Sequence, residues 1–356
     1  MRLLIDLDGT ICELKKTGQT YADVRVNPGA SEKLKALKKA GHYIILHTAR
    51  HMKTCNGDVE LVKVKVGQIT IDWLAKHKIP YDELHFGKPY AEAYIDDLTF
   101  PFTNWGNFNP EILDTSQVNI LITMAGVGSR FVKAGFKQPK PLISVKGKAM
   151  VEWAMNSFDF LDSHKNKKLI FLALKEHIEN YRLDKELKRF FGSQIAIISV
   201  PAVTGGQAET ALLASPQINN FQKLFIYNCD TYSQSPIWEL IQTEDPDGVI
   251  PCFESNDPRY SYVRVDKFGY GAEVAEKKVI SNLATTGMYY FKRGMDFVSS
   301  ALALKALGEK QKGEFYIGPC YNELIKAGKK IRTVKAIKNY VLGTPEELEV
   351  FKKYKV

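Results

Sequence analysis

The sequence predicts an α/β protein made of two α/β domains. The chain has 356 residues, which is longer than a single hydrophobic core usually supports. Short apolar runs alternate with amphipathic segments in two separate stretches, and a segment without clear periodicity lies between them. Such alternation is typical of sheets covered by helices, with functional groups collected at the carboxyl ends of the parallel strands. We therefore expect one sheet and one site in each domain.

The first stretch extends to about Leu98 and predicts strand, helix, strand, helix and strand in that order. The expected strands are 2–7 (RLLIDL), 42–48 (HYIILHT) and 93–98 (AYIDDL), and the expected helices are 28–41 and 66–78. Asp6, Thr48 and Asp96 then lie at strand ends. Residues 99–116 contain two prolines and three asparagines, which favours a connector. The predicted domains are accordingly 1–108 and 117–356.

The second stretch repeats the alternation from Val118 onwards, and we expect a mixed sheet here. Its periodic segments are 118–126, 149–158, 169–174, 195–200, 206–214 and 223–230, followed by shorter strand-like runs and a final helix at 344–354. Residues 313–325 (GEFYIGPCYNELI) indicate another helix, with Glu314 and Tyr316 as candidates for the border of an acceptor pocket. We find no internal repeat and no low-complexity tract.

Composition excludes several classes of protein. Hydrophobic residues make up 45% of the chain and charged residues 25%, and no run approaches the roughly 18 apolar residues of a membrane helix. The amino terminus MRLLIDLDGT does not resemble a secretion signal. Five cysteines in an odd set without short paired spacing indicate neither disulfides nor a zinc site, so we expect a cytoplasmic protein. The net charge of +9 is spread over dispersed lysines, which argues against a nucleic-acid partner.

Two acids end the first predicted strand. Asp6 and Asp8, in DLDGT, lie two residues apart, so both can face one site, and Gly9 permits a sharp turn. A carboxylate that attacks a phosphate needs a divalent cation and a positive side chain to offset charge repulsion. Lys88 in HFGKPY and the pair Asp96–Asp97 offer these groups.

The ordered set DLDGT, HTAR, GKP and IDD resembles the four motifs of the haloacid dehalogenase superfamily and spans nearly all of the first hundred residues. The resemblance implies that Asp6 is the nucleophile and Asp8 the general acid and base. It further implies that Thr48 holds the phosphoryl group and that Lys88 ties it to the nucleophile. Asp96 or Asp97 would complete a Mg²⁺ shell with Asp6 and the backbone carbonyl of Asp8, and the choice between these two acids is open.

The short spacing between these motifs leaves no room for a large cap domain, so the resemblance predicts a capless Rossmann-like domain with an open site. The stretch from HTARHMKT to YDELHFGKP further resembles phosphatase-like proteins encoded with capsular polysaccharide biosynthesis. Arg50, His51 and Lys53 have two readings: they reach a substrate phosphate or carboxylate, or they form a solvated basic loop.

A glycine-rich turn follows the first predicted strand of the second domain. Its backbone N–H groups, at Ala125, Gly126, Gly128 and Ser129, can cradle a triphosphate. Arg130 in the same turn and Lys140 about ten residues later add two positive groups for a polyphosphate.

This arrangement resembles the signature of the nucleotidyltransferases that make nucleoside-diphosphate sugars. The resemblance implies that Gly206 and Gln207, in GGQAE, lie against the nucleobase. It also implies that Asp230, in NCD, binds the catalytic Mg²⁺ and that an acceptor contacts four further residues: Glu276, Lys277, Thr286 and Gly287. Such enzymes join an acceptor phosphate to the α-phosphorus of a nucleoside triphosphate and release pyrophosphate, with charge compensation from groups such as Arg130 and Lys140.

The sequence departs from this pattern at three positions. Val341 stands where an aspartate is expected, which leaves the second metal ligand unassigned. Lys278 replaces a proline and Cys229 a glycine. These departures leave the acceptor open between a phosphorylated sugar and a phosphorylated polyol or choline-like alcohol. They favour CTP as the donor, with UTP, GTP and dTTP also open.

The whole-chain expectation is a bifunctional enzyme of capsule or cell-surface polysaccharide precursor synthesis. It combines a nucleotidyltransferase (EC 2.7.7-type) with a phosphatase (EC 3.1.3-type), each dependent on Mg²⁺, and its partners are a nucleoside triphosphate and a phosphorylated sugar or polyol. One alternative is a nucleotidyltransferase whose first domain is inert and serves a structural or regulatory role. Another is a noncatalytic scaffold. A homodimer is compatible with the sequence, but no feature fixes the oligomeric state.

Overall fold

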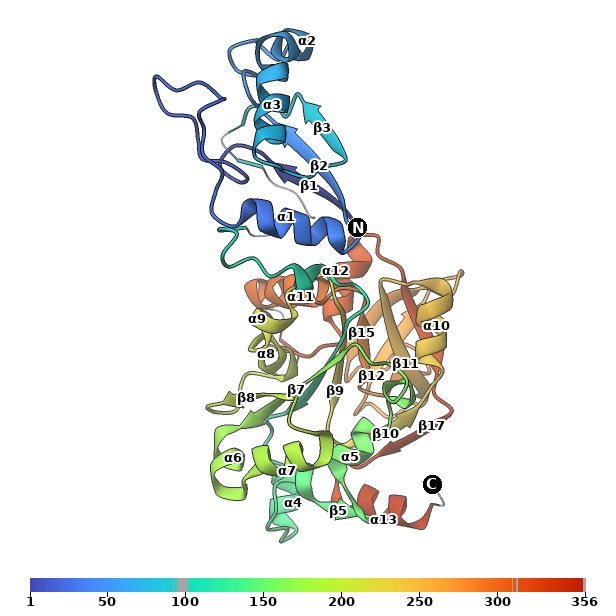
Figure 1. Cartoon of the computed structure of the whole chain (residues 1–356). Helices are drawn as coiled ribbons and strands as arrows, with labels where there is room; N and C mark the ends of the chain where they lie inside the picture. The colour runs from blue at the N-terminus through green and yellow to red at the C-terminus, as the bar shows by residue number, and fades with distance from the viewer. Residues whose placement is uncertain (92, 95–101, 309, 312, 355–356) are drawn as a thin grey trace. The chain divides into compact units, whose positions relative to one another are not determined.

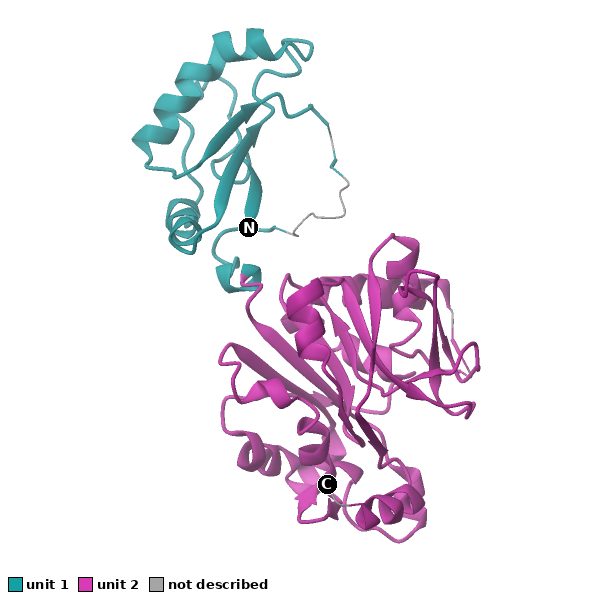
Figure 2. Ribbon diagram, turned by 90° about the vertical axis from the view of Figure 1, so that its right-hand side faces the viewer, with its two compact units in different colours: residues 1–113 teal, residues 114–356 magenta. Residues whose placement is uncertain are grey.

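The computed structural model describes residues 1–91, 93–94, 102–308, 310–311 and 313–354. These fall into two compact units, Met1–Leu113 and Asp114–Val356 (Figure 2). The boundary lies within the expected connector, 99–116, and the described part of that segment up to Leu113 belongs to the first unit. Trp105 is 3% exposed, and its indole N–H donates to the backbone oxygen of Thr10 at 2.8 Å. This hydrogen bond and the burial of the indole attach the segment around Trp105 to the first unit.

The first unit contains a three-stranded parallel sheet, in the order β1 (Arg2–Asp6), β2 (Tyr43–Thr48) and β3 (Glu83–Phe86) (Figure 1). The helical elements are α1 (Ala30–Lys39), α2 (Val59–Val62), the π-helical turn η1 (Lys63–Gly67) and α3 (Gln68–Lys76). A short 3₁₀ helix, η2, covers Pro110–Leu113. The sequence pattern missed β3, which has only four residues. Of the expected strand 93–98, only 93–94 are among the described residues.

The second unit is built on a mixed sheet with the strand order β13-β12-β14-β11-β15-β9-β4-β7-β8, with β16 paired to β11. The strands β4, β7, β8 and β9 are parallel to their neighbours within this set, and β15 joins β9 antiparallel. The strand bounds are β4 Val118–Met124, β7 Lys167–Leu174, β8 Ala196–Val200, β9 Lys223–Asn228, β11 Gly248–Glu254, β12 Ser261–Val265, β13 Gly271–Glu276, β14 Leu283–Thr285, β15 Tyr289–Phe291 and β16 Ile331–Lys335.

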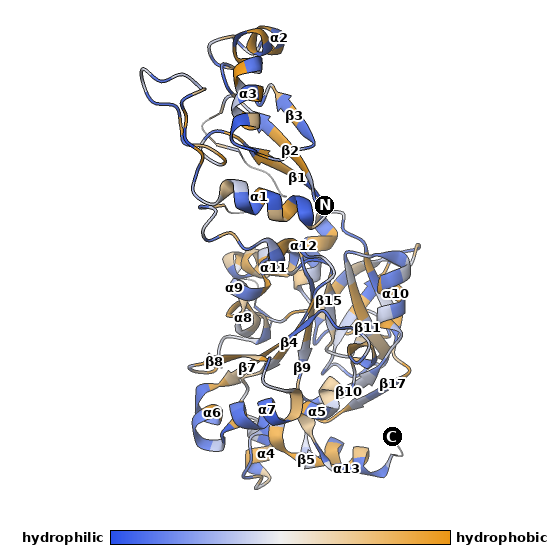
Figure 3. Cartoon of the chain, in the orientation of Figure 1, coloured by the Kyte–Doolittle hydropathy of each residue, from blue (hydrophilic) through white to orange (hydrophobic). Residues whose placement is uncertain are grey.

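Helices cover both faces of this sheet, so its central strands are buried on both sides. All seven residues of β4 are buried, and its five apolar side chains belong to two clusters, Leu121 to one and the other four to the second. One cluster includes residues of α8 (Gln207–Leu212), α9 (Ser215–Ile218), α11 (Gly294–Leu307) and α12 (Cys320–Lys326). The other includes residues of α5 (Met150–Met155), α7 (Leu183–Phe191) and α10 (Ile237–Glu244). Figure 3 shows the corresponding contrast between hydrophobic strands and helices of mixed hydropathy.

Two small sheets complete the unit. They pair β5 (Ser144–Val145) with β6 (Lys148–Ala149), and β10 (Thr231–Gln234) with β17 (Lys338–Val341). The remaining elements are α4 (Ser129–Lys133), α6 (Lys175–Tyr181), α13 (Pro345–Lys353), and the 3₁₀ turns η3 (Lys140–Leu142) and η4 (Asp159–Leu161). The helix expected over 313–325 covers only its second half, because Phe315 is held in extended pairing with the Gly205 loop. No helix in the described ranges is long and apolar enough to cross a membrane.

Candidate active sites

The second unit contains a cavity of about 550 Å³, which we call the transfer cavity. It is lined by nine of the site candidates singled out in the sequence: Arg130, Lys140, Gln207, Asp230, Glu276, Lys277, Thr286, Gly287 and Tyr316. They come from elements that are far apart in the sequence. The structure therefore gathers both the expected phosphate-binding groups and the expected acceptor-side groups around one space.

Parallel strands position the phosphate side of the cavity. The glycine-rich turn follows β4, and Asp230 follows the neighbouring β9. Gly128 has a φ of 66°, and a methyl group placed on it would lie 3.1 Å from Lys140 Cβ. This glycine therefore allows the turn to approach η3 closely.

Lys140 and Asp230 form an ion pair between the ammonium Nζ and the carboxylate Oδ2. Burial alone would lower the pKa of Lys140, but the neighbouring Asp230 carboxylate more than offsets it, so the pKa is raised. The cavity thus holds a fixed positive charge. Burial, with help from Asp230, also raises the pKa of the adjacent Cys229 thiol to about 12, which keeps this thiol protonated and inert.

The Gly205–Gly206 loop is held against Phe315. The amide of Phe315 donates to the Gly205 oxygen at 2.8 Å, and the Phe315 oxygen accepts from the Ala208 amide at 3.0 Å. Gly206 has a φ of 136°, and a methyl group on it would lie 2.4 Å from the Phe315 oxygen. Only glycine fits this approach. The loop orients Gln207, whose Nε2 donates to Thr123 Oγ1 at 2.8 Å.

The acceptor-side candidates also line the cavity. Lys277 has a φ of 52°, and its ammonium donates to the Tyr316 hydroxyl while lying 4.5 Å from the ring centroid. Glu276 accepts a hydrogen bond from Ser261 Oγ. At Gly287, with a φ of 85°, a methyl group would lie 2.9 Å from Asn228 Nδ2. This tight turn therefore holds the acceptor wall against the end of β9.

Five of the expected nucleotide-binding residues are not among the residues that line the cavity: Ala125, Gly126, Gly128, Ser129 and Gly206. Four belong to the turn that carries Arg130, and Gly206 directly precedes Gln207. Their contribution to the described site is therefore to shape the loops that present lining side chains. Tyr316 lines the cavity as expected, whereas Glu314 is not a lining residue.

The sequence analysis missed several residues that line the cavity, among them Arg259, Tyr260, Asn339 and Glu347. Glu347 carried a local signal, because Thr344 followed three residues later by glutamate is a helix-start pattern. Thr344 does cap α13 by accepting from the Glu347 amide at 3.2 Å. The Glu347 side chain, however, lies at the cavity and accepts from Arg259 at 3.3 Å, which the local pattern could not indicate.

The first unit brings four of its expected residues together at the carboxyl ends of its strands. Lys88 Nζ lies 3.0 Å from Asp6 Oδ2, and the Lys88 amide donates to the Thr48 oxygen at 3.2 Å. Thr48 Oγ1 donates to Asp8 Oδ2 at 3.2 Å. Asp96 and Asp97, the expected metal-binding acids, lie outside the described residues.

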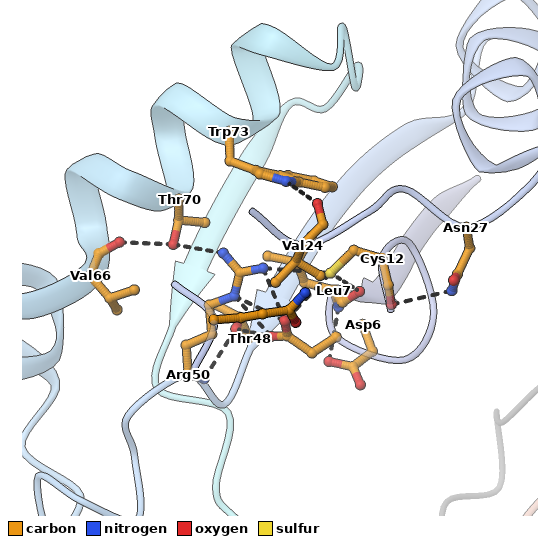
Figure 4. A network of polar contacts seen from close by, with 12 residues as sticks. Asp6, Leu7, Cys12, Val24, Asn27, Thr48, Arg50, Val66, Thr70 and Trp73 are labelled. Carbon is orange, nitrogen blue, oxygen red and sulfur yellow. Dashed lines mark hydrogen bonds and ion pairs between the residues drawn. The ribbon is translucent and has the colours of Figure 1, made fainter. Parts of the chain in front are cut away.

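Arg50 fits neither of the two interpretations given for the basic segment after Thr48, because it is buried and paired with Asp8. Its side chain is fully buried, and it binds Asp8 through Nε at 3.0 Å and through Nη2 at 2.9 Å. Nη1 donates to Thr70 Oγ1 at 3.1 Å, and the guanidinium lies 4.3 Å from the Tyr21 ring centroid. Figure 4 shows this network, with Arg50 directed toward the loop that carries Leu7 and Cys12. Of its neighbours, His51 contacts Thr54, and Lys53 is exposed and lies over Tyr90.

Within the described ranges, no three His, Cys, Asp or Glu side chains gather as a preformed metal site. The transfer cavity instead offers scattered oxygen donors. Besides Asp230 and Glu347, it is lined by Asn228 and Asn339, whose Oδ1 atoms are buried without a hydrogen-bond partner.

No protein-family model and no curated protein matches the sequence. Among similar solved structures, a nucleoside-diphosphate-sugar pyrophosphorylase from Vibrio cholerae RC9 is 27% identical with a TM-score of 0.58, over 66% of this chain and 100% of its own. An inositol-1-phosphate CTP transferase from T. maritima is 14% identical, with a TM-score of 0.51 over 68% and 98%. A UDP-glucose pyrophosphorylase in complex with UDP-glucose is 17% identical, with a TM-score of 0.52 over 67% and 100%. About two thirds of the chain therefore has a nucleotidyltransferase-like fold.

Proposed function

We propose that the second unit is a nucleotidyltransferase that activates a phosphorylated sugar or polyol. The observation that carries this proposal is the transfer cavity, which is lined by Lys140 and Asp230 together with Glu276 and Lys277. The similarity to the Vibrio cholerae pyrophosphorylase supports it, since that protein matches over its whole length and about two thirds of this chain. The second unit accounts for about two thirds of the chain.

In the proposed reaction, an acceptor phosphate oxygen attacks the α-phosphorus of the nucleoside triphosphate. A new P–O bond forms, the bond to the β-phosphate oxygen breaks, and pyrophosphate leaves with the electron pair. No protein nucleophile is required. Lys140 and Arg130 offset the repulsion between the two anions. The Gly126 turn and Gly206 loop shape the donor side with Gln207, and Thr286 and Gly287 shape the acceptor side with Lys277.

The oxygen donors at the cavity fit a Mg²⁺ ion. Asp230 supplies a carboxylate, and the partnerless oxygens of Asn228 and Asn339 are groups that a bound ion, its water or a substrate could satisfy. Mg²⁺ in such sites is usually held by one or two carboxylates together with substrate phosphates and water. When bound, the ion would supply neutralising charge to the triphosphate.

The identities of the donor nucleotide and of the acceptor are further parts of this proposal. CTP is the favoured donor because the departures at Lys278, Cys229 and Val341 resemble those of cytidylyltransferases that act on phosphorylated alcohols. A role in capsule or cell-surface polysaccharide synthesis rests on the resemblance of the first hundred residues.

Pyrophosphate release tests the transferase. The full chain is incubated with Mg²⁺, one of CTP, UTP, GTP, ATP or dTTP, and a panel of sugar 1-phosphates, polyol phosphates and phosphocholine. We expect acceptor-dependent release with one nucleotide and its loss in Asp230→Asn. Release from no combination, by a protein that also fails to bind any nucleotide, would contradict the proposal.

The first unit supports a second candidate function, a phosphatase. Lys88 lies 3.0 Å from Asp6, as a group that holds a phosphoryl oxygen beside its nucleophile would. Attack by an Asp6 oxygen would form an aspartyl phosphate, and the alcohol would leave with a proton from Asp8, while Thr48 holds the phosphoryl group. Asp8 would then take a proton from the water that hydrolyses the aspartyl phosphate, which releases phosphate and restores Asp6. Asp6 and the Asp8 backbone oxygen would be the described ligands for Mg²⁺. The alternative is an inert unit with a structural or regulatory role.

Two matched variants separate these activities. Asp6→Asn should abolish phosphate release while sparing pyrophosphate release, and Asp230→Asn should do the reverse. If Asp6→Asn leaves phosphate release unchanged, the first unit is not the phosphatase. If either variant silences both activities, the two sites are not independent.

A further inference from the structure

Glu347 and Val341 both lie beside Gly343, and Val341 stands where the resemblance predicts an aspartate. A methyl group placed on Gly343 would lie 3.2 Å from Glu347 Oε2 and 3.4 Å from Asp230 Oδ2. The two carboxylate oxygens therefore border the same methyl-sized space. Gly343 leaves that space open, since it has no side chain.

Val341 borders the same space but offers no ligand. Its Cγ1 atom lies 3.6 Å from the same methyl position, and it is paired with Thr231 across β10 and β17. The strand register thus directs position 341 to the cavity, where this chain has hydrocarbon. Glu347 reaches the space from the first turn of α13 instead.

A basic side chain pairs with each of the two carboxylates. Asp230 Oδ2 is paired with Lys140, and Glu347 Oε1 is paired with Arg259 at 3.3 Å. The other Glu347 oxygen, Oε2, is the one that lies 3.2 Å from the methyl position on Gly343. Two nearby carboxylates repel each other, and a divalent cation relieves that repulsion.

We propose that Glu347 is the second carboxylate that, with Asp230, positions the divalent cation accompanying the nucleotide, and so replaces the aspartate absent at Val341. This inference rests on the proposed transferase function. Position 347 carries the cation-binding role from a helix, whereas position 341 would carry it from a strand. The Arg259 pair holds Glu347 at the cavity in the absence of the cation.

Direct Mn²⁺ binding tests this role without an activity assay. MnCl₂ is titrated into the full chain carrying Asp6→Asn, so that the first unit's nucleophile carboxylate does not contribute, and free Mn²⁺ is followed by electron paramagnetic resonance. We expect Glu347→Gln and Asp230→Asn each to weaken Mn²⁺ binding by roughly tenfold or more, an effect of the size seen when metal-site groups are lost. Glu347→Asp should retain part of the affinity.

Two controls make the outcome specific. Glu346→Gln removes the adjacent exposed carboxylate and should leave Mn²⁺ affinity unchanged. Arg259→Gln breaks the ion pair but keeps the Glu347 carboxylate, so binding should be retained. Equal binding by Glu347→Gln and the parent, a loss in Arg259→Gln as large as in Glu347→Gln, or no Mn²⁺ binding by the parent would each overturn the proposal. Pyrophosphate release is measured separately, so inactivity toward every nucleotide would count against the proposed function and not against this ion-binding result.

Discussion

Lys140 is a largely buried lysine that keeps its positive charge because a carboxylate lies beside it. Its ammonium is largely enclosed, yet the Asp230 carboxylate keeps its pKa raised. A lysine placed in this way stays cationic at neutral pH, as its proposed role toward the phosphates of a nucleotide requires.

Replacing Lys140 with alanine should lower the rate of pyrophosphate release by roughly a hundredfold, because one preorganised positive group is lost from the developing charge. Lys137→Ala is the control, since Lys137 is exposed in the same segment and should leave the rate unchanged. Steady-state kinetics measures both. An unchanged rate in Lys140→Ala would remove this lysine from the mechanism.

Arg50 plays a different role, because its bidentate pair with Asp8 is part of the interior of the first unit. Replacing Arg50 with glutamine should destabilise that unit by about 3 kcal/mol, since it leaves a carboxylate without its buried partner. Arg50→Lys should be intermediate, because lysine keeps the charge but loses the planar fork.

Amide hydrogen exchange in peptides of the first unit measures this effect of Arg50. Arg2→Gln is the control: Arg2 is 62% exposed and pairs with Glu83 at the surface, so no measurable change is expected. Unchanged exchange in Arg50→Gln would show that the ion pair does not stabilise the unit.

The sequence, together with its resemblance to nucleotidyltransferases, predicted part of the lining of the transfer cavity, including Lys140 after the glycine-rich turn and Asp230 after β9. It could not predict Arg50 or Glu347 correctly. Whether a charged side chain is buried depends on partners that are distant in sequence, such as Thr70 for Arg50 and Arg259 for Glu347. The residues next to Arg50 and Glu347 in the sequence do not indicate these contacts.

At the level of elements, the Gly205–Gly206 loop depends on backbone space. Gly206→Ala should destabilise the second unit by about 2–4 kcal/mol and weaken nucleotide binding, because the new methyl group meets the Phe315 backbone at 2.4 Å. Gly135→Ala is the control that shows the effect of backbone strain without a steric clash. Gly135 also has a positive φ, but nothing lies within 4 Å of the added methyl group. It should cost only about 1–2 kcal/mol.

Urea unfolding and nucleotide titration measure the two effects of the glycine substitutions. If Gly206→Ala and Gly135→Ala behave alike in both, the close packing against Phe315 has no role in the site.

Helices and strands were predicted correctly where the segment was long and were missed where it was short. The segments at 118–126 and 223–230 contain β4 and β9 because continuous apolar runs between turn signals are typical of buried strands. Strand β3 was missed because four residues are too few to show an alternating pattern. The extended segment before α12 was missed because its conformation depends on hydrogen bonds to the Gly205 loop, which the local pattern does not show. Pairing with a distant chain segment is a tertiary property.

At the scale of the whole molecule, the buried thiols and phenols predict sensitivity to alkali. Burial raises the pKa of Cys229 from its ordinary value of about 9 to about 12, and it also raises the pKa values of Cys252 and Tyr227. Below about pH 9 these thiols are protonated in both states, so their contribution to stability is complete. As the pH rises further, the unfolded chain loses protons that the folded unit retains, so stability falls.

The urea midpoint of the second unit should accordingly decrease between about pH 8 and about pH 10. Cys229→Ala should reduce that decrease, because it removes one of the groups that ionise only on unfolding. Circular dichroism at the two pH values measures the midpoint. A midpoint that rises with pH would contradict the predicted direction.

The most direct test of the central claim, that the transfer cavity binds a nucleoside triphosphate, is a thermal-shift measurement with CTP, UTP, GTP, ATP and dTTP in the presence of Mg²⁺. Binding to the folded state alone raises the unfolding temperature. We predict a rise of several degrees with one nucleotide, reduced in Lys140→Ala and lost in Asp230→Asn. No rise with any nucleotide, or an equal rise in Asp230→Asn, would contradict the account.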